Sequence, residues 1–293
     1  MKSGFIGVIG KANAGKSTLV NVLVGEKVAI VSPKPQTTRT SIMGVLTKPE
    51  YQLVFVDTPG IYKSENYFTD LMLKNTETAA KDVDFLLFVH EGINGVSGED
   101  ISLMKRYLSG RIPMAIAYSK IDIMPKEKIV EDMKILYENG IDCDVFPISA
   151  RKYTNIRKLE SYLVEKVPEG ERVIQEDIVS DKSVKFMVAE IMREKILLKF
   201  DDEVPHGIAI VINKFERREN GTYEINLDIV CEKANHKAIL IGKQGRAIKE
   251  VSSFAREGME KFLEAKVFLT TYVRVEENWR SRPGLINDIY GKI

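Results

Sequence analysis

The sequence predicts an α/β protein in which a mostly parallel sheet, covered by helices on both faces, is followed by a smaller α+β domain. The first half of the chain alternates short apolar, β-rich segments with amphipathic helical segments, as in parallel sheets buried on both faces. After a polar stretch, the order becomes helix, two alternating strands, two helices and a strand. A length of 293 residues allows two domains of ordinary size.

The expected strands of the first domain are short apolar runs bounded by glycine, proline or polar residues. They are residues 5–10, 42–47, 51–56, 84–90, 112–118 and 143–149. Amphipathic segments that predict covering helices lie between or after them, at residues 98–110, 126–140 and 154–167.

A polar, charged stretch that opens with Pro168 and Gly170 indicates a linker, although short apolar pairs inside it could pack on a domain. We therefore expect domains at 1–167 and 183–275, a linker at 168–182 and a tail at 276–293. In the second domain, a helix over 183–200 precedes a hairpin with Asn220-Gly221 at its turn. Its last strand is expected at 266–276.

Composition excludes several classes of protein. The net charge is +1, from 43 basic and 42 acidic residues, so any nucleic-acid site must be a local patch. No apolar run reaches the roughly 18–20 residues that span a bilayer, and we expect a cytoplasmic protein. The three histidines are scattered, which gives no support to a histidine metal site, and Cys143 and Cys231 are expected to be buried structural thiols.

Residues 10–17, GKANAGKS, fit the phosphate-binding pattern G-x-x-x-x-G-K-[ST] between a strand and a helix. Gly10 and Gly15 let backbone N–H groups surround phosphates, Lys16 neutralises them, and Ser17 coordinates Mg²⁺. A glycine-rich turn beside a surface lysine is the alternative, and the strand–loop–helix context argues against it. The other expected nucleotide contacts of this segment are Lys11, Ala12, Asn13, Ala14 and Thr18.

DTPG, residues 57–60, follows a strand and is expected to lie beside the phosphate loop. Asp57 can hold Mg²⁺ through water, and Gly60 can donate its N–H to the γ-phosphate, so the segment can sense hydrolysis. Thr58, Pro59 and Ile61 are further expected nucleotide contacts. In the polar loop between the two motifs, Thr37 or Thr38 can complete the Mg²⁺ shell.

Two strand ends predict a base-reading site at one sheet edge. Asp122 of SKID can accept hydrogen bonds from guanine N1–H and the exocyclic amine, a pattern that adenine lacks. Lys120 can pack its stem on the base, and the ISA segment offers Ser149 and the Ala150 N–H near guanine O6. Taken alone, SKID is typical of a solvated strand end; the ordered set of motifs makes the functional interpretation stronger.

A second glycine loop, Gly242-Lys243-Gln244-Gly245, lies between two helical segments. Such G-x-x-G loops let a nucleic-acid backbone approach closely, and the order of elements resembles a type II KH domain. Residues 233–249 contain five basic and no acidic residues, which supplies the local basic patch that a nucleic-acid site requires. The alternative to a KH domain is an ordinary helix–turn–helix surface with a charged face. The expected RNA contacts are Lys237, Ile241, Gly242, Lys243, Gln244, Gly245, Arg246 and Lys249, with Ile239 and Ile248 either in the groove or in the core.

With NAGKSTLVN, PQTTRT, VDTPG and IGKQG in this order, nearly the whole chain resembles the Era family of bacterial GTPases. The resemblance implies a P-loop GTPase domain followed by a type II KH domain, with GTP, GDP and Mg²⁺ as ligands and slow intrinsic GTP hydrolysis. It favours Thr38 over Thr37 as the Mg²⁺ ligand, so that Lys16, Thr38 and Gly60 carry catalysis. Asn13 resembles the asparagine that holds K⁺ in relatives with a hydrophobic residue at position 61.

The resemblance also implies partners: 16S rRNA near its 3′ end, the 30S subunit during its assembly and maturation, and peripheral association with the membrane. We expect a monomer. Two residues depart from the family pattern: Ser119 stands where an asparagine braces the base-reading loop, and Arg151 where a lysine is common. Both touch the base pocket and leave the RNA domain unaffected.

Two other classes of function are compatible with parts of the sequence. A small-molecule kinase would share the phosphate loop but should have a substrate pocket in place of DTPG and the G-x-x-G module. A pure RNA-binding protein would not need Lys16, Ser17 and Asp57 together. In the tail, Trp279 or Tyr290 could stack on RNA bases. For Trp279, packing on the KH core is favoured over this stacking.

Overall fold

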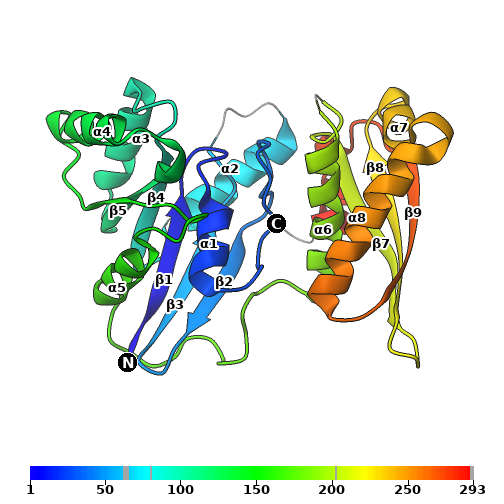
Figure 1. The fold of residues 1–293 in the computed structure, drawn as a ribbon, viewed down its shortest axis with the longest axis horizontal. Helices are drawn as coiled ribbons and strands as arrows, with labels where there is room; N and C mark the ends of the chain where they lie inside the picture. Colours follow the sequence, from blue (N-terminus) through cyan, green and yellow to red (C-terminus); the bar gives the residue numbers. More distant parts are fainter. Residues whose placement is uncertain (62–65, 80, 202, 291–293) are drawn as a thin grey trace. The chain divides into compact units, whose positions relative to one another are not determined.

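The computed structural model describes residues 1–61, 66–79, 81–201 and 203–290 (Figure 1). The described residues divide into two compact units. The first gathers those within 1–29, 38–63 and 72–181, and the second those within 30–37, 64–71 and 182–293. The last three residues of the expected tail lie outside the described residues.

The first unit is built on a six-stranded sheet of order β2-β3-β1-β4-β5-β6, in which β2 and β3 pair antiparallel and the other neighbours pair parallel. This confirms the predicted mostly parallel sheet. The strands are β1 Lys2–Ile9, β2 Ile42–Thr47, β3 Tyr51–Asp57, β4 Phe85–Glu91, β5 Met114–Ser119 and β6 Val145–Pro147.

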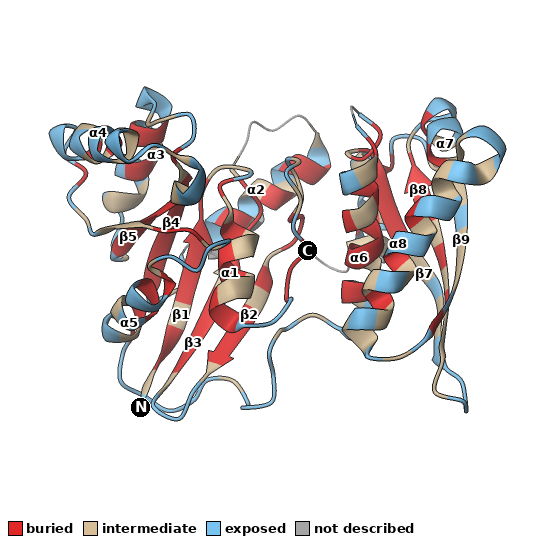
Figure 2. Cartoon of the chain, viewed as in Figure 1, coloured by how far each residue is buried: buried red, intermediate tan, exposed pale blue. Residues whose placement is uncertain are grey.

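Two apolar cores lie on the two faces of this sheet, because successive side chains of a strand point to opposite faces. Val8 and Leu87 pack with α1 and α5, whereas Ile9 and Phe88 pack with α3 and α4. The strands are therefore buried on both sides, which explains their near-continuous apolar sequences (Figure 2). The helices are α1 Lys16–Val24, α2 Tyr67–Ala79, α3 Gly98–Leu108, α4 Lys126–Glu138 and α5 Ile156–Lys166.

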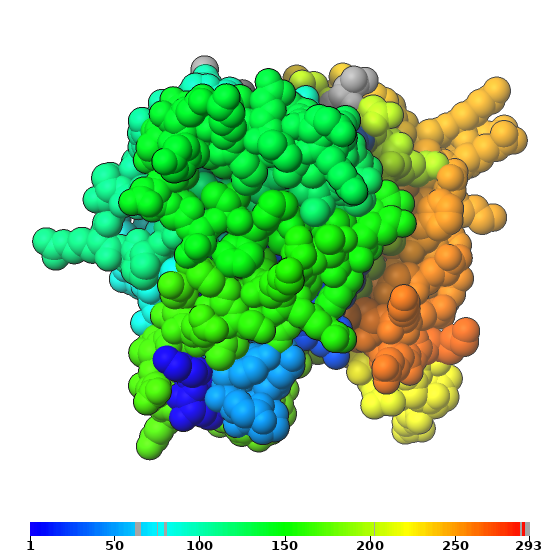
Figure 3. Space-filling view, turned by 60° about the vertical axis from the view of Figure 1, so that its left-hand side comes forward, coloured from blue at the N-terminus to red at the C-terminus, as the bar shows by residue number. Residues whose placement is uncertain are grey.

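The outer surfaces of α3, α4 and α5 carry many charged residues, although Val130 and Tyr137 of α4 are also exposed. Ser97 and Asp100 form a capping box at the start of α3. On the face shown in Figure 3, the green surface belongs to the part of the chain that carries α4 and α5. The amphipathic pattern that predicted α3, α4 and α5 thus corresponds to one buried and one exposed side of each helix, whereas α2 was not predicted from the sequence.

The expected linker, residues 168–182, contains no helix or long strand, and most of it packs on the first unit. Glu169 forms a bridge with Lys2, and Ser180 forms one with Gly44. The side chain of Gln52 accepts hydrogen bonds from residues 173 and 174 and donates one to the carbonyl of residue 174. The segment therefore follows the sheet instead of leaving it at residue 168.

The second unit contains a three-stranded sheet of order β7-β8-β9 with helices packed on it. Its elements are α6 Val184–Lys199, β7 Ile208–Arg217, β8 Tyr223–Cys231, α7 Ala234–Ile241, α8 Arg246–Leu263 and β9 Val267–Val275. β7 and β8 pair antiparallel, and β8 and β9 pair parallel. The predicted order and the hairpin turn at Asn220-Gly221 are confirmed.

Helix α6 contributes a buried ion pair to the second unit. The side chain of Arg193 is fully buried and pairs with Glu190 one turn earlier. Its remaining N–H groups donate to the carbonyls of Gln36 and Thr37, which belong to the same unit. A buried guanidinium needs this number of acceptors, since an unpaired buried charge is costly.

The expectations about three side chains, those of Trp279, Cys231 and Cys143, have clear outcomes. Trp279 is fully buried and donates its indole N–H to the carbonyl of Gly207 (2.9 Å), so packing of this side chain is confirmed. Cys231 is buried in β8, as expected. The prediction for Cys143 was wrong: it lies half-buried just before β6, because the apolar run from 143 forms a strand only from Val145.

Candidate functional site

The phosphate loop joins β1 to α1. Gly15 adopts a left-handed conformation (φ 96°) directly before the helix, so that the first N–H groups of α1 point into the loop. Lys16 is buried, and its ammonium donates to the carbonyls of Gly10 (3.1 Å) and Lys11 (3.0 Å). Burial lowers the pKa of Lys16 to about 8. The Lys11 ammonium pairs with Asp100 at the start of α3 (2.7 Å).

Three oxygen-bearing side chains meet beside this loop. The Ser17 hydroxyl donates to Asp57 Oδ2 (2.6 Å) and lies 2.8 Å from the Thr38 hydroxyl. Thr37 instead donates to the carbonyl of Lys34 (2.6 Å), so the geometry favours Thr38 as the member of this cluster.

Asp57 is fully buried, and burial raises its pKa to about 6. Its Oδ1 is buried without a hydrogen-bond partner among the described residues. Carboxylate and hydroxyl oxygens are the ligands that Mg²⁺ prefers. An orphaned carboxylate oxygen beside the hydroxyls of Ser17 and Thr38 therefore fits a Mg²⁺ ion. Among the described residues, no group of three or more His, Cys, Asp or Glu side chains could hold a different metal.

DTPG lies directly against the phosphate loop. A Cβ atom at Gly60 would come within 2.6 Å of the Ala12 Cα, so only glycine allows this approach. The Ile61 N–H donates to the carbonyl of Gly10 (3.1 Å). Thr58 donates its hydroxyl to the carbonyl of Val8 (2.8 Å) and so ties the segment to β1. The Gly60 backbone is thus placed where it can meet a terminal phosphate.

The base-reading loop follows β5 and holds an uncommon backbone conformation. Lys120 is left-handed (φ 65°), which costs free energy for a residue other than glycine. The loop is fixed on both sides: the Ser119 hydroxyl donates to the carbonyl of Ala14 (2.6 Å), and the Ile121 N–H donates to that of Ile148 (3.3 Å). Ser119 therefore braces this loop against the phosphate loop despite its short side chain.

The remaining predicted nucleotide contacts lie around these two loops. Asp122 is exposed on the short helix that follows Lys120, and Ser149 is buried after β6 with Ala150 half-buried beside it. Lys11, Ala12, Asn13 and Ala14 form the phosphate loop, Thr18 lies in the first turn of α1, and the carbonyl of Pro59 accepts from Thr76.

Sequence reasoning missed two side-chain contacts that lie behind the base-reading loop. Glu91, at the end of β4, pairs with the Lys120 ammonium. Tyr118, buried in β5, donates its hydroxyl to Asp132 of α4. The first contact depends on strand register and the second on how α4 docks on the sheet. The only sequence signal for either was the position of Glu91 at the end of an expected strand.

In the second unit, the G-x-x-G loop separates α7 from α8. Gly242 has φ 71°, and a Cβ atom there would lie 2.7 Å from that of Ala247. Lys243, Arg246 and Lys249 are exposed, and Gln244 is exposed with a left-handed backbone, while Lys237 and Ile241 are half-buried. Ile248 packs on the apolar core and Ile239 is exposed, which leaves Ile239 free to line a groove.

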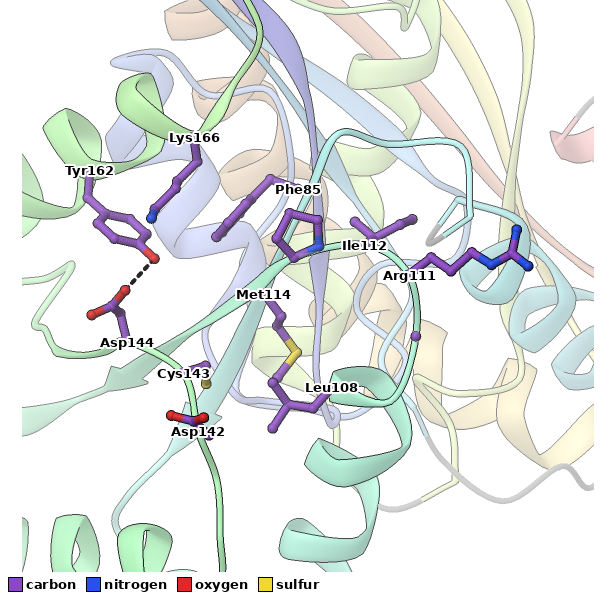
Figure 4. Close-up of a pocket in the computed structure, with 12 residues that line it drawn as sticks. Phe85, Leu108, Arg111, Ile112, Met114, Asp142, Cys143, Asp144, Tyr162 and Lys166 are labelled. Carbon is purple, nitrogen blue, oxygen red and sulfur yellow. Dashed lines mark hydrogen bonds between the residues drawn. The ribbon is translucent and has the colours of Figure 1, made fainter.

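A pocket of about 400 Å³ lies far from these loops along the strands (Figure 4). Phe85 and Met114, the first residues of β4 and β5, line it together with Tyr162, which donates to Asp144 (2.7 Å). Ligands of such sheets bind at the carboxyl ends of the strands. This pocket is at the amino ends, so it is separate from the candidate nucleotide site.

Comparison with protein-family models agrees with the two-part organisation. Residues 5–120 match a model described as a 50S ribosome-binding GTPase. Residues 203–280 match a KH domain model. In addition, none of the described helices is long and apolar enough to cross a membrane.

Relatives match the chain over nearly its full length. It is 43% identical to the GTPase Era of Clostridium kluyveri over 289 residues, 99% of each chain. It is 42% identical to that of Clostridium botulinum, over 98% of this chain and 97% of the relative. A solved structure of Era in complex with MgGDPNP and nucleotides 1506–1542 of 16S ribosomal RNA matches with a TM-score of 0.95 and 32% identity over 100% of both chains. An Aquifex aeolicus Era variant bound to GDP·AlF4⁻ gives the same values.

Substitution at Ser119 tests whether its hydroxyl braces the base-reading loop. Ser119→Ala removes the donor to the Ala14 carbonyl, and we expect GDP to dissociate about tenfold faster, because one buried hydrogen bond is lost and one acceptor is left unpaired. Ser119→Asn restores a longer donor and should stay within about twofold of the wild type. Stopped-flow release of a fluorescent GDP measures both rates. Equal rates for wild type and Ser119→Ala would contradict the bracing role.

Proposed function

The chain belongs to the Era family of GTPases, and we propose that it hydrolyses GTP with Mg²⁺ and binds 16S rRNA near its 3′ end during assembly and maturation of the 30S subunit. The observation that carries this proposal is the meeting of Ser17, Thr38 and the orphaned Asp57 carboxylate oxygen beside Lys16. This cluster provides an oxygen site for Mg²⁺ and a cation for the phosphates at one point.

Hydrolysis uses charge neutralisation and positioning in the phosphate loop. Lys16 exchanges its two loop carbonyls for the β- and γ-phosphate oxygens, and the N–H groups at the start of α1 hold the remaining charge. Bound Mg²⁺ supplies further neutralisation of the β- and γ-phosphates. Ile61 has no side-chain polar group to orient water, so the intrinsic rate is slow.

The same geometry gives a switch. Thr38 contacts Ser17, and Gly60 lies against Ala12 of the phosphate loop. A γ-phosphate with its Mg²⁺ would add contacts to both residues, and hydrolysis would remove those added contacts. Both residues stand in loops, which can move without unfolding the sheet. We propose Lys16, Thr38 and Gly60 as the catalytic residues on this basis.

RNA binding is assigned to the face around the G-x-x-G loop. Gly242 permits a close backbone approach, and the exposed Lys243, Arg246 and Lys249 supply positive charge for phosphates. Gln244 and Gly245 complete the loop. The domain limits 1–167 and 183–275 are proposed as the limits of the GTPase and KH parts.

Finer features of the function are also proposals. Asn13 is exposed in the phosphate loop with φ 63°, which leaves its amide oxygen available to a K⁺ ion; equal turnover in sodium and potassium buffers would remove this ion. A ribosomal RNA partner supports our proposal that the protein is cytoplasmic. The proposal of a peripheral membrane pool rests on the family resemblance. The proposal of a monomer rests on the sequence alone.

Asp122→Asn tests base recognition. An asparagine cannot accept both hydrogen bonds from guanine N1–H and the amine, but it can pair with the 2-carbonyl of xanthine. We expect GTP affinity to fall by at least about a hundredfold and xanthosine triphosphate to become the preferred nucleotide. Titrations of both nucleotides against both proteins measure the change, and unchanged preference for GTP would contradict the assignment of Asp122.

The double variant Lys243→Glu/Arg246→Glu tests the RNA surface without the strain that a side chain at Gly242 would create. Reversing two exposed charges should weaken binding of a 16S rRNA 3′ fragment by about tenfold or more and reduce the salt dependence, while GTP hydrolysis without RNA is unchanged. Lys261→Glu, near the other end of α8, is the control and should bind RNA as the wild type does. If the double variant also binds normally, the RNA site lies elsewhere.

A further inference from the structure

The acidic residue Glu91 lies behind the base-reading loop because of strand register. In the parallel pairing of β4 and β5, Glu91 stands opposite Ser119, the residue before Lys120. Its carboxylate pairs with the Lys120 ammonium. Both side chains are partly shielded, with 23% of Glu91 and 33% of Lys120 exposed. The charge of Lys120 is therefore held on the side of the loop that faces β4.

The carboxylate of Asp122, two residues after Lys120, is by contrast neither shielded nor paired within the described residues. It is exposed, and it has no hydrogen bond or ion pair with any part of the chain that the structure describes. A lysine side chain is a long, flexible point charge that can reach a carboxylate two residues away. If the Lys120 ammonium were released, Asp122 would be the nearest unpaired carboxylate on its own loop.

We propose that Glu91 is a positioning residue for guanine recognition, which holds the Lys120 ammonium away from Asp122 and so keeps that carboxylate free for the base. The proposal rests on the proposed GTP function and concerns the same site. An Asp122 carboxylate paired with Lys120 would have to give up that ion pair before it could accept the two guanine N–H groups. Binding would then lose part of its free energy to the competing pair.

The backbone of the loop does not depend on Glu91. Hydrogen bonds from Ser119 to Ala14 and from Ile121 to Ile148 fix the chain on both sides of Lys120. A partly exposed ion pair also contributes little to folding stability. Loss of the Glu91 charge should therefore release the ammonium, leave the loop in place and affect binding far more than folding.

Glu91→Gln is the test variant, since it keeps the shape of the side chain and removes its charge. A neutral amide competes poorly with an ionised Asp122 for the ammonium. We expect GDP affinity, measured by titration of the full-length protein, to fall about tenfold while the melting temperature without nucleotide stays within about 2 °C. Glu138→Gln, which removes an exposed acid from α4, is the matched control and should change neither value.

Two backgrounds separate this mechanism from a structural role. In the Lys120→Met variant there is no ammonium that could pair with Asp122. In the Asp122→Asn variant, which is titrated with xanthosine diphosphate, there is no carboxylate with which the Lys120 ammonium could pair. Adding Glu91→Gln to either background should change affinity by less than about twofold. The same tenfold loss in both backgrounds, no loss in the wild-type background, or a melting temperature lowered by about 5 °C or more would overturn the proposal.

The outcome is also distinguishable from failure of the proposed function. If the chain is not a guanine-nucleotide enzyme, the wild type itself will bind guanine and adenine nucleotides alike. If only the role of Glu91 is mistaken, the wild type keeps its guanine preference, and Glu91→Gln behaves like Glu138→Gln or acts equally in every background.

Discussion

The nucleotide site depends on two opposite charges, Lys16 and Asp57, that the fold buries within electrostatic range of each other. Parallel pairing of β1 with β3 sets Asp57 opposite Val8, two residues before the phosphate loop begins at Gly10. Burial lowers the pKa of Lys16 and raises that of Asp57, so each charge is costly in the site without ligands. Triphosphate oxygens and Mg²⁺ offset these costs. Burial of both charges therefore favours binding of a ligand that neutralises them.

Around this charge pair, specificity comes from loops held in uncommon conformations. Asn13 and Lys120 both have positive φ, and each would relax if its neighbours did not fix it. Ser119 links the two loops through the Ala14 carbonyl, and the family resemblance implies this bracing role for an asparagine at the same position. Because this hydrogen bond ties the proposed base-reading loop to the phosphate loop, the proposed recognition of guanine and of phosphate would occur at one edge of the sheet.

Motifs with fixed spacing could be interpreted from the sequence, because their chemistry depends on residues close in the chain. The phosphate loop, DTPG and the G-x-x-G loop are of this kind, and the alternation of apolar runs gave the sheet. Contacts set by register or docking could not be predicted. One is the pair of Glu91 with Lys120. Another is the course of residues 168–181 along the first sheet, where the short apolar pairs indicated only that the segment could pack on a domain. Cys143 was misplaced because an apolar run shows that a strand exists but does not locate its first residue.

The most direct test of a guanine-specific, Mg²⁺-dependent phosphate site is a calorimetric titration of the nucleotide-free protein with GTP and with ATP, each with Mg²⁺ and with a chelator. The buried charges and the free Asp122 predict that GTP with Mg²⁺ binds at least about a thousandfold tighter than ATP with Mg²⁺. They also predict that the chelator weakens GTP binding. Equal affinity for the two nucleotides, or GTP binding that is indifferent to Mg²⁺, would contradict the account.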